Sequence, residues 1–208
     1  GLERLVFAEH LAGFDDRALA AEIAAHPTLT GQADPTRRAV RDGAVTCNLL
    51  APPLGPATRA FLTALELRLA AWIAALPGDP GHPWLAAKPA GWRLIGWGNV
   101  LRGPGHQAPH IHNLGWLSGV YYVQVPAAIR ADDATQGGWI RFGRPGYGLP
   151  TRRPPETRAL PPTQGGLVLF PSYLWHETLP FAGEGERISL AFDLQAREAP
   201  LPRGEGLG

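Results

Sequence analysis

The stretch Gly166-Leu-Val-Leu-Phe-Pro-Ser-Tyr-Leu-Trp-His176 is an apolar run, typical of a β-strand, that ends in a histidine. Other short runs rich in Val, Ile, Leu, Tyr, Trp and Phe lie between clusters of Gly and Pro, a pattern that indicates strands joined by turns. Together with residues 166–170 of the quoted stretch, the predicted strands cover residues 91–101, 117–125, 138–142 and 187–194. The second half of the chain is therefore predicted to consist of short β-strands.

Two helices are expected before these strands. Residues 15–25 begin with two aspartates and continue with mostly Ala, Leu and Ile, which favours a short amphipathic helix. Residues 56–76 place apolar side chains at helical spacing and stop before a Pro-Gly pair. One further strand is predicted near Val45–Leu50. Helices followed by several short strands indicate an α+β, mainly β fold with the helices packed outside a sandwich or barrel.

The length of 208 residues favours a single domain. Within it we distinguish an N-terminal helical support region, residues 1–90, a strand-rich core, residues 91–194, and a tail, residues 195–208. Gly (26) and Pro (22) are frequent, but seven Trp and an apolar fraction of 45% argue against disorder. The Pro- and Arg-rich segment 143–163 is expected to form a long surface loop.

The charges nearly balance, with 19 Lys and Arg against 18 Asp and Glu, so no nucleic acid or anionic membrane partner is expected. No apolar stretch approaches the length of a membrane span, and the N-terminus lacks the layout of a secretory signal. A single cysteine, Cys47, forms neither an intrachain disulfide nor a thiolate metal cluster. These features fit a reducing compartment, and we expect a cytoplasmic protein.

Three of the seven histidines lie within Gly105–His112. In an extended strand, His110 and His112 point to the same side, where two imidazoles can bind one ion. His176 is the candidate third ligand, and such a distant partner is natural for opposite strands of a jelly roll. Neutral imidazole suits iron, copper, zinc or nickel. A solvated His-x-His pair in a Pro-rich loop is the alternative.

The last strand-like run, 187–194, alternates in polarity. One face carries four apolar residues, and the other carries Arg187, Ser189, Ala191 and Asp193. An arginine fork beside a hydroxyl is suited to a planar carboxylate, which it binds through paired charge-assisted hydrogen bonds. The alternative is a surface ion pair of Arg187 with Glu184 or Glu186.

Four ordered segments resemble the 2-oxoglutarate and Fe(II)-dependent oxygenases, in particular a bacterial and phage group of that superfamily. They are His110-Ile-His112, Leu117-Ser-Gly-Val-Tyr-Tyr-Val123, Gly166-Leu-Val-Leu-Phe-Pro-Ser-Tyr-Leu-Trp-His176 and Arg187-Ile-Ser189. The resemblance covers roughly residues 91–194. It implies a double-stranded β-helix, or jelly roll, that uses Fe(II) and 2-oxoglutarate.

The resemblance also implies roles for individual residues. His110 and His176 would hold the iron, while Arg187 and Ser189 would bind the distal carboxylate of 2-oxoglutarate with help from Tyr122. The implied reaction is hydroxylation of a C–H bond in an unidentified substrate, with release of succinate and CO2.

The sequence departs from the superfamily pattern at one position. Most members place Asp or Glu two residues after the first histidine, whereas this chain has His112. His112 is then a third ligand, an unbound residue beside a water-filled position, or a sign that oxygenase chemistry has been lost. We favour the first, because strand alternation already points His112 inward. Glu177 is a candidate replacement carboxylate, but as the strand neighbour of His176 it is expected to face away.

The substrate is a small molecule or a peptide of unknown identity. Trp97 and Asn99 share a strand face before the histidines and Trp116 follows them, so all three are candidate substrate contacts. A second copy of the chain, in a homodimer, stays open as a partner. Two other functions remain: a three-His, cupin-like dioxygenase that uses no 2-oxoglutarate, and a non-catalytic jelly-roll binding module.

Overall fold

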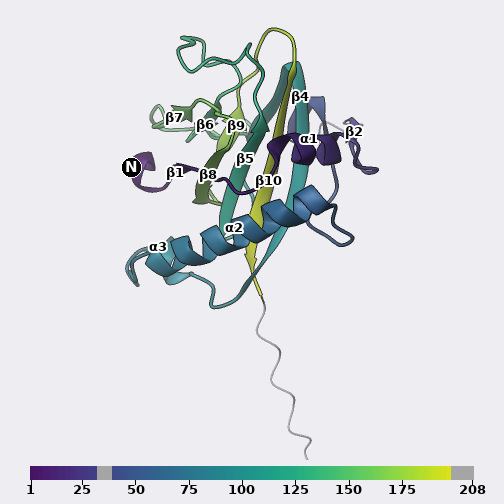
Figure 1. The fold of residues 1–208 in the computed structure, drawn as a ribbon. Coiled ribbons are helices and arrows are strands. Elements are labelled where there is room, and N and C mark those ends of the chain that lie inside the picture. The colour runs from purple at the N-terminus through teal and green to yellow at the C-terminus, as the bar shows by residue number, and fades with distance from the viewer. Residues whose placement is uncertain (32–38, 198–208) are drawn as a thin grey trace, which may run out of the picture.

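A computed structural model describes residues 1–31 and 39–197 of the chain (Figure 1). The helical elements are the 3-10 turn η1 (Leu2–Arg4), α1 (Asp16–Ala24), α2 (Pro56–Ala75) and α3 (Pro83–Ala86). The strands are β1 (Phe7–His10), β2 (Thr30–Gly31), β3 (Val40–Val45), β4 (Trp92–His110), β5 (Leu117–Gln124), β6 (Ile140–Phe142), β7 (Arg158–Leu160), β8 (Gly166–Pro171), β9 (His176–Thr178) and β10 (Glu186–Ala196). The predicted helices and the predicted α+β, mainly β class are confirmed.

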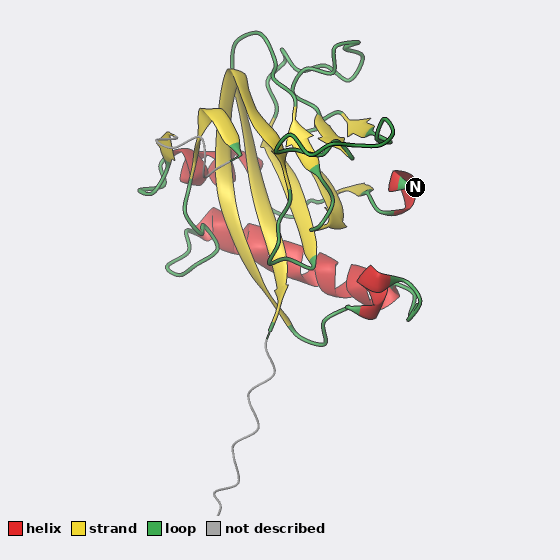
Figure 2. Ribbon diagram, turned by 180° about the vertical axis from the view of Figure 1, so that it is seen from behind, coloured by secondary structure: helices red, strands yellow, loops and turns green. Residues whose placement is uncertain are grey.

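The strands of the described residues form one curled antiparallel sheet in the order β1-β8-β5-β10-β4-β9-β6-β7, with β3 beside β4 and β2 beside β3. The long strand β4 belongs to both parts of this sheet, the large part with β10 and the small part with β9. Residues 92–102 of β4 pair with β10, whereas Gln107 and His110 pair with β9. Figure 2 shows the tall central strands from the side opposite the helices. β4 therefore carries the chain from the large sheet to the short strands β9, β6 and β7.

Helices α1 and α2 lie against one face of the large sheet (Figure 1). They bury one stripe each, including Leu19 and Ile23 of α1 and Phe61, Leu65 and Leu69 of α2. The same apolar cluster contains the sheet residues Ile188, Leu190, Phe192 and Leu194. Alternation along β10 thus directs one set of side chains to the helices and the other set, beginning with Arg187, to the opposite face.

The strand predicted at Val45–Leu50 is wrong, because the strand β3 ends where that prediction begins. After Val45, side-chain oxygens replace some of the backbone carbonyl groups that would accept hydrogen bonds from β4 in a regular strand pair. Thr46 Oγ1 accepts a hydrogen bond from the backbone N–H of Gly98, and Asn48 Oδ1 accepts one from Gly96, both at 3.0 Å. Polar side chains that bond to backbone in this way compete with strand pairing.

The other boundaries also shift. Strand β4 continues past residue 101 to His110, and the segment 143–163 contains the short strand β7 in addition to loop. Of the expected tail, residues 198–208 lie outside the described part of the chain. Within residues 1–31 and 39–197, no helix combines the length and apolar character that crossing a bilayer requires.

Candidate metal centre

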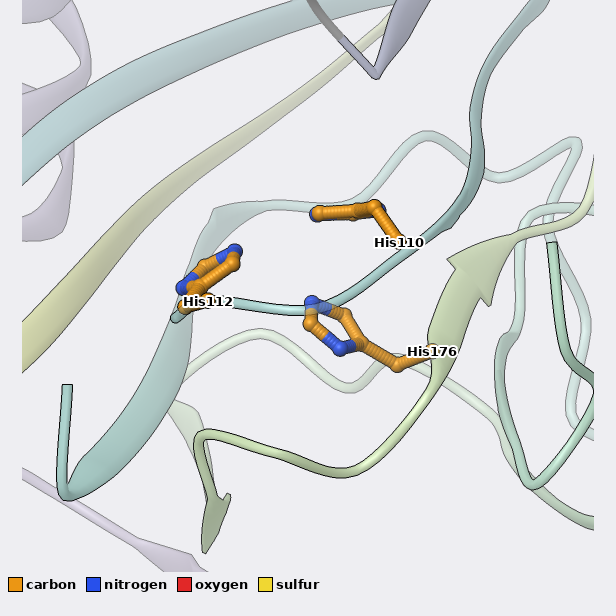
Figure 3. Close-up of side chains that lie close together, drawn as sticks. All are labelled: His110, His112 and His176. Carbon is orange, nitrogen blue, oxygen red and sulfur yellow. The ribbon is translucent and has the colours of Figure 1, made fainter. Parts of the chain in front are cut away.

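Three histidine side chains converge at the junction of β4 and β9 (Figure 3). His110 is the last residue of β4, His112 follows two residues later, and His176 opens β9 directly opposite His110. One ring nitrogen from each lies within 4.8 Å of the other two. The ring centroids are 4.2 Å apart for His110 and His176, and 5.0 Å apart for His112 and His176. The predicted convergence of these three residues is therefore present in the structure.

Hydrogen bonds set the tautomer of each ring. His110 Nδ1 lies 2.7 Å from the carbonyl oxygen of Ala108, and His176 Nδ1 lies 2.9 Å from that of Leu174. A carbonyl oxygen can only accept, so Nδ1 carries the proton in both rings. The lone pair is left on Nε2, which is the arrangement of a metal-ligating histidine with a hydrogen-bonded outer nitrogen.

The imidazoles of His110 and His176 are also neutral at ordinary pH. Burial lowers the pKa of His110 to about 4, with the neighbouring His112 acting in the same direction. Burial likewise lowers the pKa of His176 well below its ordinary value. Three converging imidazoles, two of them held neutral by burial, fit a first-row transition metal.

His112 has a partner that the other two histidines lack. Its Nδ1 lies 2.5 Å from Oδ1 of Asp193 on β10, and both side chains are largely buried. Asp193 shares a strand face with Arg187, as alternation predicts, and is a site residue that the sequence motifs do not include. A carboxylate on that inward face was the available signal.

Arg187 forms a second polar group on the same face of the sheet. It is 1% exposed, and its Nε and NH1 atoms have no hydrogen-bond partner among the described residues. The Tyr122 hydroxyl beneath it also has none, and Ser189 lies opposite Tyr122 in the strand ladder. The alternative surface ion pair with Glu184 or Glu186 is not formed among the described residues: Arg187 is buried, and Glu186 pairs with Arg102.

The electrostatics of this group favour an anion. Burial lowers the pKa of the Arg187 guanidinium, although the nearby Tyr122 acts to raise it. Burial also raises the pKa of the Tyr122 hydroxyl. A guanidinium nevertheless stays protonated in a protein. A buried cation without a counter-charge is costly, so a carboxylate ligand that pairs with Arg187 would remove a substantial penalty.

The two groups share one cavity. A narrow cavity is lined by all three histidines and by Arg187. A larger cavity of about 410 Å³ adjoins it and shares the side chains of Trp97, His110 and His112. A molecule held by Arg187 and a molecule in the larger cavity would therefore both lie beside the histidines.

The candidate substrate contacts divide between cavity and core. Trp97 and Asn99 line the larger cavity, and the buried Asn99 amide has no hydrogen-bond partner at either atom. Trp116 does not line either cavity: its ring stacks on Trp84 at 4.8 Å, and each indole N–H donates to the other residue's backbone carbonyl. Assigning Trp116 to the substrate site is therefore wrong, because its aromatic surface and its N–H group are both used in the core.

Glu177 faces away from the histidines, as expected for the strand neighbour of His176. Its carboxylate pairs with Arg141 at 2.8 Å and with Arg144 at 3.3 Å. Opposite charges hold it on the outer side of β9. Glu177 is therefore not brought to the metal centre.

A family model matches the part of the chain that carries these features. The family model described as "Putative 2OG-Fe(II) oxygenase" matches residues 96–193. These residues contain the histidine triad and Arg187. No curated protein matches the chain.

Solved structures share the fold at low sequence identity. A prolyl-4-hydroxylase from Pseudomonas putida is 21% identical over 92% of each chain, with a TM-score of 0.60. HygX from Streptomyces hygroscopicus, with nickel and 2-oxoglutarate bound, is 12% identical over 93% of this chain and 83% of HygX, with a TM-score of 0.62. A viral collagen prolyl hydroxylase from Paramecium Bursaria Chlorella virus-1 is 11% identical over 93% and 97%, with a TM-score of 0.58.

The likeness extends over almost the whole chain and confirms the jelly-roll fold. The residues matched by the family model include the strands that carry the histidines and Arg187. The three histidines singled out in the sequence converge in the structure. Over residues 96–193, the chain is similar to the 2OG-Fe(II) oxygenase family.

Proposed function

We propose that the protein hydroxylates a C–H bond of a small molecule or peptide, using Fe(II) and 2-oxoglutarate and releasing succinate and CO2. The observation that carries the proposal is one cavity lined by three converging histidines and by a buried arginine whose Nε and NH1 atoms have no hydrogen-bond partner. The first group suits a transition metal, and the second suits a carboxylate.

Each group has a separate task. His110, His112 and His176 hold the metal through Nε2, while their Nδ1–H groups are held by protein oxygens. Fe(II), 2-oxoglutarate and dioxygen together supply the oxidising power for the C–H bond, and the protein supplies orientation and a water-poor cavity. The chain does not need an acid or base of its own at the reacting carbon.

Arg187 orients the cosubstrate. Its unpartnered Nε and NH1 atoms offer two hydrogen bonds to the distal carboxylate of 2-oxoglutarate. The Tyr122 hydroxyl, which also lacks a partner, and the buried Ser189 hydroxyl supply further donors. Anchoring the far end of the molecule directs its other end toward the histidines in the same cavity.

The larger cavity is the proposed substrate site. Its volume of about 410 Å³ is in the range that accommodates small molecules. Trp97 offers an apolar wall next to His112, with ring centroids 5.4 Å apart. The Asn99 amide offers a donor and an acceptor to a polar group of the bound molecule.

The second candidate is a three-His, cupin-like dioxygenase that uses no 2-oxoglutarate. The third histidine favours it, because His112 stands where most superfamily members have a carboxylate ligand. In that case Arg187 would hold a carboxylate of the substrate itself.

An anaerobic titration separates the candidates. Fe(II) with 2-oxoglutarate should produce the weak visible charge-transfer band of their chelate, and Arg187→Ala should abolish it. The exposed Arg102 provides the control, since Arg102→Ala should keep the band. Iron binding without the band favours the cupin-like enzyme, and an absence of iron binding contradicts both enzymes.

The third ligand needs its own variants. His112→Ala should weaken Fe(II) binding about as much as His110→Ala does. Retention of wild-type iron affinity in His112→Ala would exclude the three-His site. Succinate release under air, with and without candidate substrates, then tests turnover.

A further inference from the structure

The three candidate ligands include no carboxylate, but the carboxylate of Asp193 forms a hydrogen bond with one of them, His112. Asp193 is 5% exposed, and its Oδ1 lies 2.5 Å from Nδ1 of His112. No Lys or Arg of the described chain forms an ion pair with Asp193, whereas the buried Glu177 has two arginines. The negative charge of Asp193 is therefore directed at the His112 ring.

Two buried serines hold this pair in place. Ser118 Oγ donates to Asp193 Oδ1 at 2.6 Å and lies 2.8 Å from Ser172 Oγ. The backbone N–H of His112 donates to the carbonyl oxygen of Ser172 at 2.9 Å. Both the backbone of His112 and its carboxylate partner are thus tied to the same small network.

The chain packs closely against the network at Gly115. A Cβ atom at Gly115 would lie 2.4 Å from Ser172 Oγ and 3.3 Å from the carboxyl carbon of Asp193. The chain passes this close only because Gly115 has no side chain. The carboxylate is consequently held against the His112 ring by both hydrogen bonds and packing.

This geometry has a consequence for the metal. A carboxylate can only accept, so the hydrogen bond keeps the proton on Nδ1 and the lone pair on Nε2. It also makes the imidazole a more basic ligand, an effect that outer carboxylates typically exert on metal-bound histidines.

We propose that Asp193 is a positioning residue of the metal centre, which fixes His112 as a ligand and supplies through it the negative charge that an acidic third ligand would provide. The proposal rests on the proposed function, because it requires that the three histidines bind a metal. It explains how a three-imidazole site keeps one compensating charge close to a divalent ion.

The test measures metal affinity directly, with Co²⁺ as the probe and the full chain in the absence of oxygen and 2-oxoglutarate. Asp193→Asn should weaken Co²⁺ binding by about 10- to 100-fold, the usual cost of losing an outer-shell partner. Asp16→Asn is the matched control, because Asp16 accepts a 2.6 Å hydrogen bond from Tyr121, at a site that the histidine cavity does not include. It should leave Co²⁺ affinity unchanged.

The role of His112 as intermediary is tested by a double-mutant cycle. In the His112→Ala background, Asp193→Asn should have little further effect on Co²⁺ binding. An equal loss in both backgrounds would show that Asp193 does not act through His112. Wild-type affinity in a folded Asp193→Asn variant would also overturn the proposal.

Folding is checked by thermal unfolding of the metal-free variants. If Asp193→Asn does not fold, Ser118→Ala is the second variant, because it keeps the Asp193 carboxylate but removes a hydrogen bond that holds it. Ser118→Ala should weaken Co²⁺ binding several-fold. Unchanged Co²⁺ binding in Ser118→Ala would refute the role of the network. Failure of the wild-type protein to bind Co²⁺ would contradict the proposed function as well. Wild-type binding with unaltered variants would contradict only the role of Asp193.

Discussion

The guanidinium carbon of Arg187 lies 4.9 Å from the centre of the Tyr122 ring, and both side chains keep unpartnered polar atoms in the protein interior. The ring face offers the cation a weak attraction but no hydrogen bond. This pair is therefore organised for a ligand at the expense of the stability of the ligand-free protein.

Replacing Arg187 by an apolar side chain should abolish 2-oxoglutarate binding while stabilising the ligand-free protein. Arg187→Met should raise the free energy of unfolding of the ligand-free protein by about 1–3 kcal/mol, because a buried unpaired charge is removed. With Mn²⁺ present, 2-oxoglutarate should raise the Tm of the wild-type protein but not that of the variant. A 2-oxoglutarate-dependent rise in the variant would contradict the role of Arg187.

A substitution of Glu177 should lower stability without changing metal binding. Glu177→Gln should leave Co²⁺ affinity at its wild-type value, because the side chain points to Arg141 and away from the histidines. The free energy of unfolding should fall by about 1–3 kcal/mol, because two arginines lose their buried counter-charge. Urea unfolding and Co²⁺ titration of the same preparation check both outcomes. A loss of Co²⁺ affinity like that of His110→Ala would make Glu177 a ligand.

The buried histidines should make the metal-free protein sensitive to acid. Burial lowers the pKa of His110 to about 4 in the folded state, whereas an unfolded chain binds that proton near pH 6.5. The unfolded state therefore takes up more protons between these values, and stability falls as pH decreases through this window. The contribution of His110 should be about 2 kcal/mol at pH 5.

Urea unfolding at pH 7.5 and pH 5 measures this loss. His110→Asn should show a smaller decrease between the two pH values than the wild-type protein. Equal decreases would show that His110 is not the source. His176, whose pKa burial also lowers, should account for part of the decrease that remains in the variant.

Glu22 of α1 caps the neighbouring helix α2. Its carboxylate accepts 2.9 Å hydrogen bonds from the backbone N–H groups of Ala57 and Thr58 and a 2.8 Å bond from the Thr58 hydroxyl. Glu22→Ala should therefore cost about 1–2 kcal/mol of stability, like the loss of an N-cap. The exposed Glu66 on α2 is the control, since Glu66→Ala should have almost no effect.

The same cap gives a pH dependence. Burial acts to raise the pKa of Glu22, but the three hydrogen bonds outweigh it and the pKa is lowered. The stabilisation is thus present above the ordinary pKa of glutamate and is lost as pH falls through the lowered value. A Glu22→Ala effect of equal size at pH 7 and pH 3 would contradict this assignment.

The sequence by itself determined the local features of this protein. Alternation in residues 187–194 predicted which face of β10 carries Arg187, and helical spacing predicted α1 and α2. The spacing in His110-Ile-His112 predicted a pair of histidines on one side. Such patterns have periods of two or 3.6 residues, so they can be recognised without knowing what packs against them.

Only the tertiary structure decided the contacts between distant segments. Trp116 stacks on Trp84 instead of lining the cavity, and Asp193 contacts His112 although the two residues are 81 positions apart in the sequence. The end of β3 at Val45 depends on side chains that bond to the backbone of β4. Strand order and register bring these residues together, and neither is encoded in the periodicity of a single segment.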